Sequence, residues 1–178
     1  MAIALLGLEE ATEFRRSATR EGELWRLLTS HFSHFGWNHL VWDLAVFGVL
    51  GAVVERTNRR TFLHVLLWPA ILIPLAVGLG EPSITHYRGL SGLDSALAAF
   101  LGMTLVADRT VSPTLRTIAF LSLGGLAVKI LVEWTSGSTI FVDHVAAGFH
   151  PVPIAHLVGG AVGAGVAVVA WSQRRPSA

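Results

Sequence analysis

The chain has 178 residues, of which 52% are apolar and only 14% are charged, whereas a soluble domain carries about 25% charged residues. A mean hydropathy of +0.58 indicates an integral membrane protein, and a formal net charge of +1 leaves no overall field that would attract nucleic acid. The sequence contains no cysteine, which excludes disulfides, thiolate metal sites, iron–sulfur clusters and a cysteine nucleophile.

Five apolar blocks follow one another along the chain, separated by charged or Pro/Gly-rich connections. Each block approaches the ~20 residues that cross a ~30 Å hydrocarbon core as a helix. The sequence therefore predicts an all-α, polytopic membrane helix bundle with five visible spans. These spans are Leu40–Val54, Phe62–Leu79, Ser91–Val106, Leu115–Trp134 and Ile154–Trp171.

The five predicted spans belong to a single domain. Met1–Leu8 is a short apolar stretch that we interpret as the stump of a truncated first span. Residues 1–36 are then an amino-terminal stump and external loop, 37–171 a helical core, and 172–178 a cytoplasmic tail.

The arginines between the spans predict the orientation of the bundle. The connections after the first, third and fifth spans are basic, so these connections should face the cytoplasm. The alternate connections, Gly80–Leu90 and Thr135–Pro153, contain only Arg88 and should face outside, together with the segment before Leu40. That segment breaks the charge rule with its own arginines, although glutamates are mixed with them. The cytoplasmic arginines are Arg56, Arg59, Arg60, Arg109, Arg116, Arg174 and Arg175.

Ionisable side chains inside spans cost about 2.5–3.5 kcal/mol on insertion scales, so each is a candidate site residue. His39 and Asp43 are four residues apart and share one helix face. His156 stands about one turn inside the outer end of the last span, so these three should lie at similar depth. Lys129 and Glu133, also four apart, are interpreted as a structural ion pair.

Gly89-Leu90-Ser91-Gly92 leads from a predicted outer loop directly into the third span. Ser91 then stands at a helix amino terminus, where free N–H groups can hold an oxyanion, and the flanking glycines permit a sharp turn. A serine at such a position is more often only a helix cap. Combined with His156 at matching depth, it indicates a Ser–His nucleophile pair.

The last span carries a face of small residues. Gly159 and Gly163 have the small-xxx-small spacing that removes side-chain bulk from one side of a helix. We interpret this face mainly as a packing surface. It predicts that the helix carrying His156 packs tightly against a neighbour.

At these residues the sequence resembles the rhomboid family of intramembrane serine proteases. The resemblance covers about Glu23 to Val168 and consists of several motifs in the family's order and spacing. The matching positions are Trp25 and Arg26 in the first external loop, His34, His39 and Glu55 around the next helix, Gly89, Ser91 and Gly92 in the nucleophile motif, and His156, Gly159 and Gly163 on the last helix.

The resemblance implies a bundle related to the six-helix rhomboid core and hydrolysis of a peptide bond in or next to the transmembrane segment of a membrane protein. Ser91 would be the nucleophile and His156 the general base. The Ser91 N–H, His39 and then Asp43 would be the oxyanion donors. The family uses a dyad, so no acidic residue, such as Asp94 or Asp143, is assigned as a third member.

The implied protein is integral to a membrane, which we expect to be the bacterial inner membrane, with an active site that opens to the outer side. His31 and His34 are expected to line the path by which water reaches the site. The expected partners are the lipid bilayer and a transmembrane protein substrate, with the oligomeric state left open. No cofactor, metal or nucleic acid is implied.

Two positions depart from the family pattern. Asp43 replaces the usual asparagine; an ionised carboxylate would repel the oxyanion, whereas a protonated one can donate to it, and we favour the protonated donor. Ser95 stands where several members carry a tyrosine that supports the catalytic histidine, so His156 must be supported differently. The stretch Tyr87–Gly92 and the compact length are also similar to rhombosortases, which are associated with carboxy-terminal glycine-rich sorting signals.

Two alternatives stay open. The first is a catalytically inactive rhomboid-like protein that binds transmembrane helices, and the retention of both Ser91 and His156 argues against it. The second is a haem or metal protein that uses His31, His34 and His39 as ligands. His31 and His34 precede the span, and no carboxylate or thiolate accompanies them at ligand spacing.

Overall fold

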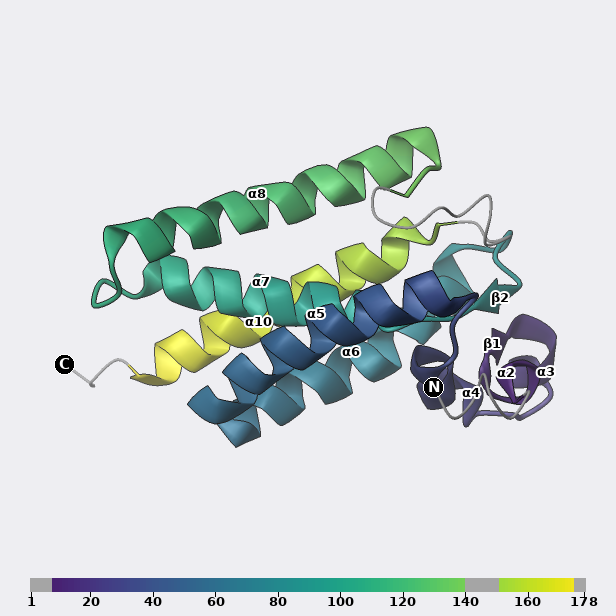
Figure 1. The fold of residues 1–178 in the computed structure, drawn as a ribbon. Helices are drawn as coiled ribbons and strands as arrows, with labels where there is room; N and C mark the ends of the chain where they lie inside the picture. The colour runs from purple at the N-terminus through teal and green to yellow at the C-terminus, as the bar shows by residue number, and fades with distance from the viewer. Residues whose placement is uncertain (1–7, 140–150, 175–178) are drawn as a thin grey trace.

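A computed structural model describes residues 8–139 and 151–174. Five long helices form the body of the molecule, and a group of short elements covers one end of it (Figure 1). The predicted all-α membrane bundle is confirmed, with one helix for each predicted span. The long helices are α5 (Trp37–Thr57), α6 (Arg59–Gly80), α7 (Ser91–Ala107), α8 (Pro113–Ser136) and α10 (Pro153–Arg174).

Four of these helices are long and apolar enough to cross a membrane, and α7 is a shorter apolar helix of 17 residues. Their ends follow from local capping. The Asn58 side chain accepts a hydrogen bond from the backbone at the start of α6, and Ser112 does the same for α8. Gly137, at a φ of 66°, ends α8 in the left-handed conformation.

Helix α7 is the centre of the bundle, because it contacts each of the other four long helices. Its closest neighbour is α10. A Cβ on Gly159 would overlap the carbonyl oxygen of Gly92, and one on Gly163 would overlap that of Ala96. The two backbones therefore approach at a distance that only glycine permits at these positions.

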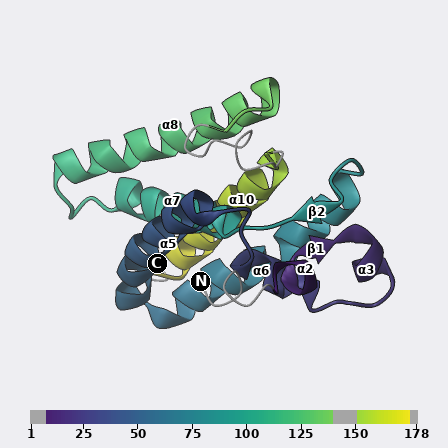
Figure 2. The same ribbon diagram turned by 45° about the vertical axis from the view of Figure 1, so that its right-hand side comes forward.

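Helix α8 lies along the outer side of α7 in both ribbon views (Figures 1 and 2). Within the described structure, Ala119 and Glu133 are its two buried residues. Leu123 lies over Gly102 of α7, so a single narrow stripe holds α8 to the bundle. Most of the remaining surface of this apolar helix is exposed, as expected of a helix that faces lipid.

The amino-terminal segment folds over the end of the bundle as short elements. Strand β1 (Phe14–Arg15) pairs antiparallel with β2 (His86–Tyr87). This pairing fixes the amino-terminal segment to the loop that leads into Ser91. The other short elements are α2 (Glu9–Thr12), α3 (Arg16–Arg20), α4 (Arg26–Thr29) and the 3₁₀ helix η1 (Ser30–Phe32).

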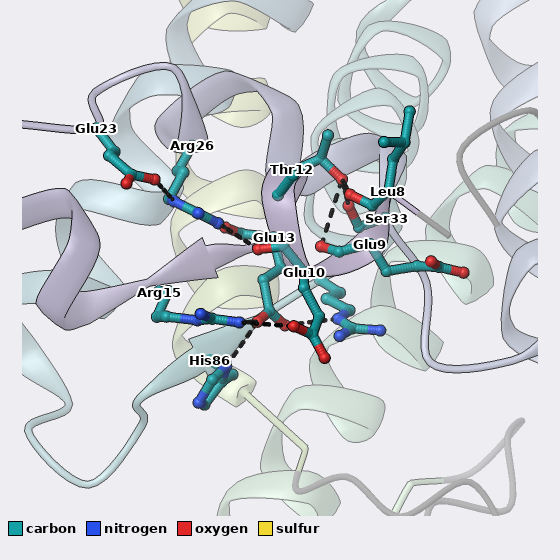
Figure 3. A network of polar contacts seen from close by, with 12 residues as sticks. Leu8, Glu9, Glu10, Thr12, Glu13, Arg15, Glu23, Arg26, Ser33 and His86 are labelled. Atoms are coloured by element: carbon teal, nitrogen blue, oxygen red, sulfur yellow. Dashed lines mark hydrogen bonds and ion pairs between the residues drawn. The ribbon is translucent and has the colours of Figure 1, made fainter. Parts of the chain in front are cut away.

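The Glu13 carboxylate organises this junction (Figure 3). It is 2% exposed, and its oxygens lie 2.9 Å from His86 Nδ1, 3.0 Å from Arg15 Nη2 and 2.7 Å from Arg88 Nε. Burial raises the pKa of Glu13, but the hydrogen bonds from Arg88, His86 and Arg15 outweigh burial, so the net pKa lies below its usual value. An ionised Glu13 therefore holds the segment just before Ser91.

Two further arginines form hydrogen bonds within the amino-terminal segment and to the end of α6. Arg16 donates to the carbonyl oxygens of Val77, Gly78 and Glu81 at the end of α6, where free carbonyls need donors. Buried Arg26 donates to the carbonyl oxygen of Glu13 at 2.9 Å and to Glu23 Oε2 at 2.6 Å. Both arginines therefore stabilise the fold of the loop.

Candidate active site

Ser91 is the first residue of α7, and the turn before it is shaped by Gly89. The φ of Gly89 is +123°, a conformation that other residues rarely adopt. A Cβ at this position would also lie 2.9 Å from the His39 ring and 3.2 Å from Asp43 Oδ2. Glycine is thus needed both for the turn and for the approach of α5 to the nucleophile loop.

Ser91 and His156 meet across the α7–α10 contact. Ser91 Oγ lies 2.9 Å from His156 Nε2, which is the distance that a nucleophile and its general base need. The Gly92–Gly159 approach lies beside this pair and sets the spacing of the two helices. The glycine face therefore also positions the two side chains, because a wider separation of α7 and α10 would move Ser91 away from His156.

The other ring nitrogen of His156 faces α8. Glu133 Oε2 lies 2.6 Å from His156 Nδ1, and Lys129 Nζ lies 2.7 Å from Glu133 Oε1 and 3.0 Å from His156 Nδ1. The predicted Lys129–Glu133 pair is present, and both residues also contact the candidate base. The four-residue spacing in the sequence predicts the ion pair, but it does not show which neighbouring helix the pair faces.

Asp43 accepts hydrogen bonds at the other side of the site. Its Oδ2 accepts the Leu90 N–H at 2.9 Å and lies 3.1 Å from His34 Nε2 and 3.3 Å from His39 Nε2. One backbone N–H and two imidazoles that gather at a single oxygen favour an ionised carboxylate. The contacts favour an anion that orients histidines and the nucleophile turn over the protonated donor that we expected from the sequence.

The expectation that His31 and His34 line a water path is wrong. His31 is buried, with Nδ1 3.3 Å from the Gly89 carbonyl oxygen and Nε2 3.0 Å from that of Ala70, and burial lowers its pKa. His34 is buried against Asp43. Both histidines instead fix the loop that precedes α5 to the site.

A cavity of about 250 Å³ joins these groups. The walls combine the polar site with apolar side chains of α5, α8 and α10, and such a mixture is typical of sites that take a largely apolar ligand. The polar residues that line the cavity include His39, Asp43, Ser91, Lys129, Glu133 and His156.

Ser95 also faces this cavity, and its hydroxyl donates to the Ser91 carbonyl oxygen at 2.9 Å. The serine that replaces the family's tyrosine therefore bonds to its own helix. The His156 ring instead contacts Glu133 of α8, which takes the place of the tyrosine as its neighbour. Asp94, one residue before Ser95, lines the cavity as well.

Other predicted positions lie away from the cavity. Trp25 is 54% exposed and donates to the Ala11 carbonyl oxygen at 3.2 Å, while Arg26 is buried in the loop. Glu55 is exposed near the opposite end of α5. Asp143 and the Met1–Gly7 part of the stump lie outside the described residues, as does the 140–150 part of the last outer connection.

The haem or metal alternative finds no support at these histidines. Both ring nitrogens of His31 face carbonyl oxygens, and His34 and His39 both face Asp43. Across residues 8–139 and 151–174, no cluster of histidine and acidic side chains has an arrangement that could hold a metal ion.

Comparison with known proteins agrees with the motifs. A family model described as the Rhomboid domain matches residues 21–173. No curated protein matches the chain. The family match runs from within the external loop to the last turn of α10 and includes every residue of the candidate site. The chain therefore belongs to the rhomboid family, whose members are generally intramembrane serine proteases.

Proposed function

We propose that this protein is an active intramembrane serine protease that cleaves a peptide bond in or next to the transmembrane segment of a membrane protein. The observation that carries the proposal is the 2.9 Å contact between Ser91 Oγ and His156 Nε2. This contact faces a cavity with apolar walls, and an apolar segment of a substrate fits such surroundings.

In the proposed reaction, the Ser91 hydroxyl proton passes to His156 Nε2 while Oγ attacks the peptide carbonyl carbon. The tetrahedral oxyanion collapses, the C–N bond breaks, and His156 returns the proton to the leaving amine. Water then attacks the acyl-enzyme with His156 again as the base, which releases the acid product and free Ser91.

The oxyanion requires donors at the start of α7. The first N–H groups of a helix have no partner within it, so the Ser91 N–H is the first proposed donor. His39, across Gly89, is the second, and to donate to the oxyanion its Nε2–H has to turn from Asp43. The Leu90 N–H already donates to Asp43. Asp43 then contributes by holding His39 and the turn rather than as the third donor.

A serine-reactive fluorophosphonate probe tests the proposal directly. The purified protein in detergent is expected to be labelled at Ser91, because His156 activates that hydroxyl, and Ser91→Ala should not be labelled. Ser136→Ala removes an exposed serine at the end of α8 and serves as the matched control, which should label as wild type does. Labelling that persists in a folded Ser91→Ala variant would show that the nucleophile is another residue.

The inactive rhomboid-like protein is the competing function. It gives Ser91 no special reactivity, so wild type would remain unlabelled under conditions that label a control serine hydrolase. The intact serine–histidine contact and the acid beside His156 favour the protease. A rhombosortase-like subtype stays a prediction, which a substrate carrying a glycine-rich carboxy-terminal sorting signal would test.

We further propose a bacterial inner-membrane location with the site open to the outer side, supported by the arginines of the connections. Thr85, beside the site, and Arg60, at the start of α6, are both exposed. In this cysteine-free chain, a membrane-impermeant maleimide added to intact cells should label Thr85→Cys and not Arg60→Cys. Labelling of Arg60→Cys alone would invert the orientation.

A further inference from the structure

Glu133 is an unexpected residue on α8. Its side chain is 2% exposed, although most of this apolar helix is exposed. A buried carboxylate is costly unless its oxygens are paired, and both are: Oε2 lies 2.6 Å from His156 Nδ1 and Oε1 lies 2.7 Å from Lys129 Nζ. The carboxylate is therefore held in place between the lysine and the histidine.

The proton on His156 decides whether the ring can act as a base. When Nδ1 carries the proton, it donates to Glu133, and Nε2 presents its lone pair to the Ser91 hydroxyl. When Lys129 donates to Nδ1, at 3.0 Å, the proton sits on Nε2 and that nitrogen can no longer accept the serine proton. Two residues of one helix turn thus favour opposite tautomers.

We propose that Glu133 is a positioning residue that holds His156 in the base tautomer and stabilises the imidazolium formed during attack. This inference rests on the proposed protease function. Helix α8 then supplies an acidic third member to the Ser91–His156 pair, by the logic of an acid that orients a catalytic histidine. Lys129 balances the charge of Glu133, and the carboxylate in turn keeps that lysine from capturing Nδ1.

A purely structural role for Glu133 makes different predictions. The ion pair with Lys129 lies within α8 and does not need His156, while Leu123 packs α8 against Gly102. Loss of packing should therefore lower stability, whereas loss of the tautomer should lower the chemical rate in a protein that is still folded. Leu123→Ala provides the matched control, because it loosens the same helix without touching His156.

The test measures kcat, KM, the rate of fluorophosphonate labelling at Ser91 and the melting temperature. Glu133→Gln is expected to lower kcat and the labelling rate by about 10²–10⁴-fold with little change in KM, as for a histidine held in the wrong tautomer. Glu133→Asp, which keeps the charge, should recover part of this loss. Leu123→Ala should lower the melting temperature and leave the labelling rate within a few-fold of wild type.

The double variant Lys129→Met/Glu133→Gln gives the sharpest test. Without Lys129, the glutamine carbonyl can accept the Nδ1 proton, so the double variant should label at least tenfold faster than Glu133→Gln alone, a non-additivity expected of groups acting through one partner. If Glu133→Gln does not fold, the labelling rate of Glu133→Asp against wild type still tests the role, and a wild-type rate in a variant whose shorter side chain no longer reaches Nδ1 would overturn it. A double variant no faster than Glu133→Gln would overturn the tautomer role.

The controls separate this inference from the protease function. If Ser91→Ala and His156→Ala lose labelling while Glu133→Gln labels at the wild-type rate, the dyad stands and the role of Glu133 is wrong. An equal loss in Glu133→Gln and Leu123→Ala would reduce Glu133 to a packing residue. If labelling survives in Ser91→Ala, the protease proposal itself fails.

Discussion

Ser91→Ala and His156→Ala are each expected to lower kcat/KM on a reconstituted transmembrane substrate by about 10⁴–10⁶-fold, the range found when a member of a serine–histidine unit is removed. Alanine at 91 removes the atom that forms the acyl bond. Alanine at 156 removes the acceptor 2.9 Å from that atom. Cleavage in proteoliposomes, followed by gel over long incubations, gives the rates.

The double variant Ser91→Ala/His156→Ala should be no slower than either single variant, because two members of one cooperating unit do not contribute independently. Neither side chain carries a helix contact as close as the Gly92–Gly159 approach, so melting temperatures should stay near wild type and serve as the control. A folded His156→Ala variant that cleaves at near wild-type rate would show that another group accepts the serine proton.

The positions of the helices could be predicted from the sequence because hydropathy identifies the segments that enter a bilayer. The residues at which the helices begin and end were predicted less accurately. The apolar block was predicted from Leu40, whereas α5 begins at Trp37, since polar residues continue a helix beyond its apolar part. Pro153 begins α10 one residue before the predicted start, where proline suits a first turn.

The meeting of Ser91 and His156 was also accessible, through their predicted depth and the small residues of α10. Glu133 and His34 were not recognised as part of the site. Helical spacing pairs Glu133 with Lys129, but which face of α8 turns toward α10 is set by packing between helices. His34 reaches Asp43 through a loop, whose path hydropathy does not describe.

The arginines before Leu40 break the charge rule that predicts the orientation. In the structure, Arg26 is buried against Glu23 and backbone carbonyls, and Arg15 is bound to Glu13. Arg16 caps the end of α6. Positive charges that are bound to carboxylates and carbonyls within a folded loop are weaker topology signals than free ones, so Arg15, Arg16 and Arg26 do not contradict the proposed orientation.

Asp43→Asn is expected to lower kcat/KM by about 30–1,000-fold, the equivalent of about 2–4 kcal/mol for a lost electrostatic partner at a transition state. Asparagine can still accept the Leu90 N–H with its carbonyl oxygen. A neutral amide cannot attract His34 and His39 as a carboxylate does, and both imidazoles now point Nε2 at the same Asp43 oxygen. The expected cause is therefore loss of orientation of His39 and of the turn before Ser91.

The opposite result belongs to the protonated-donor role that the family pattern favours for Asp43. Under that role, asparagine keeps a donor toward the oxyanion, so cleavage persists or increases, and the variant loses any fall in rate that the titration of this carboxyl causes as pH rises. Profiles of kcat/KM against pH for wild type and Asp43→Asn, on one substrate in one detergent, separate the two roles.

Asp108→Asn, in the turn between α7 and α8, is the control for the loss of one acidic side chain. Two imidazoles and the Leu90 N–H gather at the same Asp43 oxygen, which favours the anion, and we therefore expect the impaired variant.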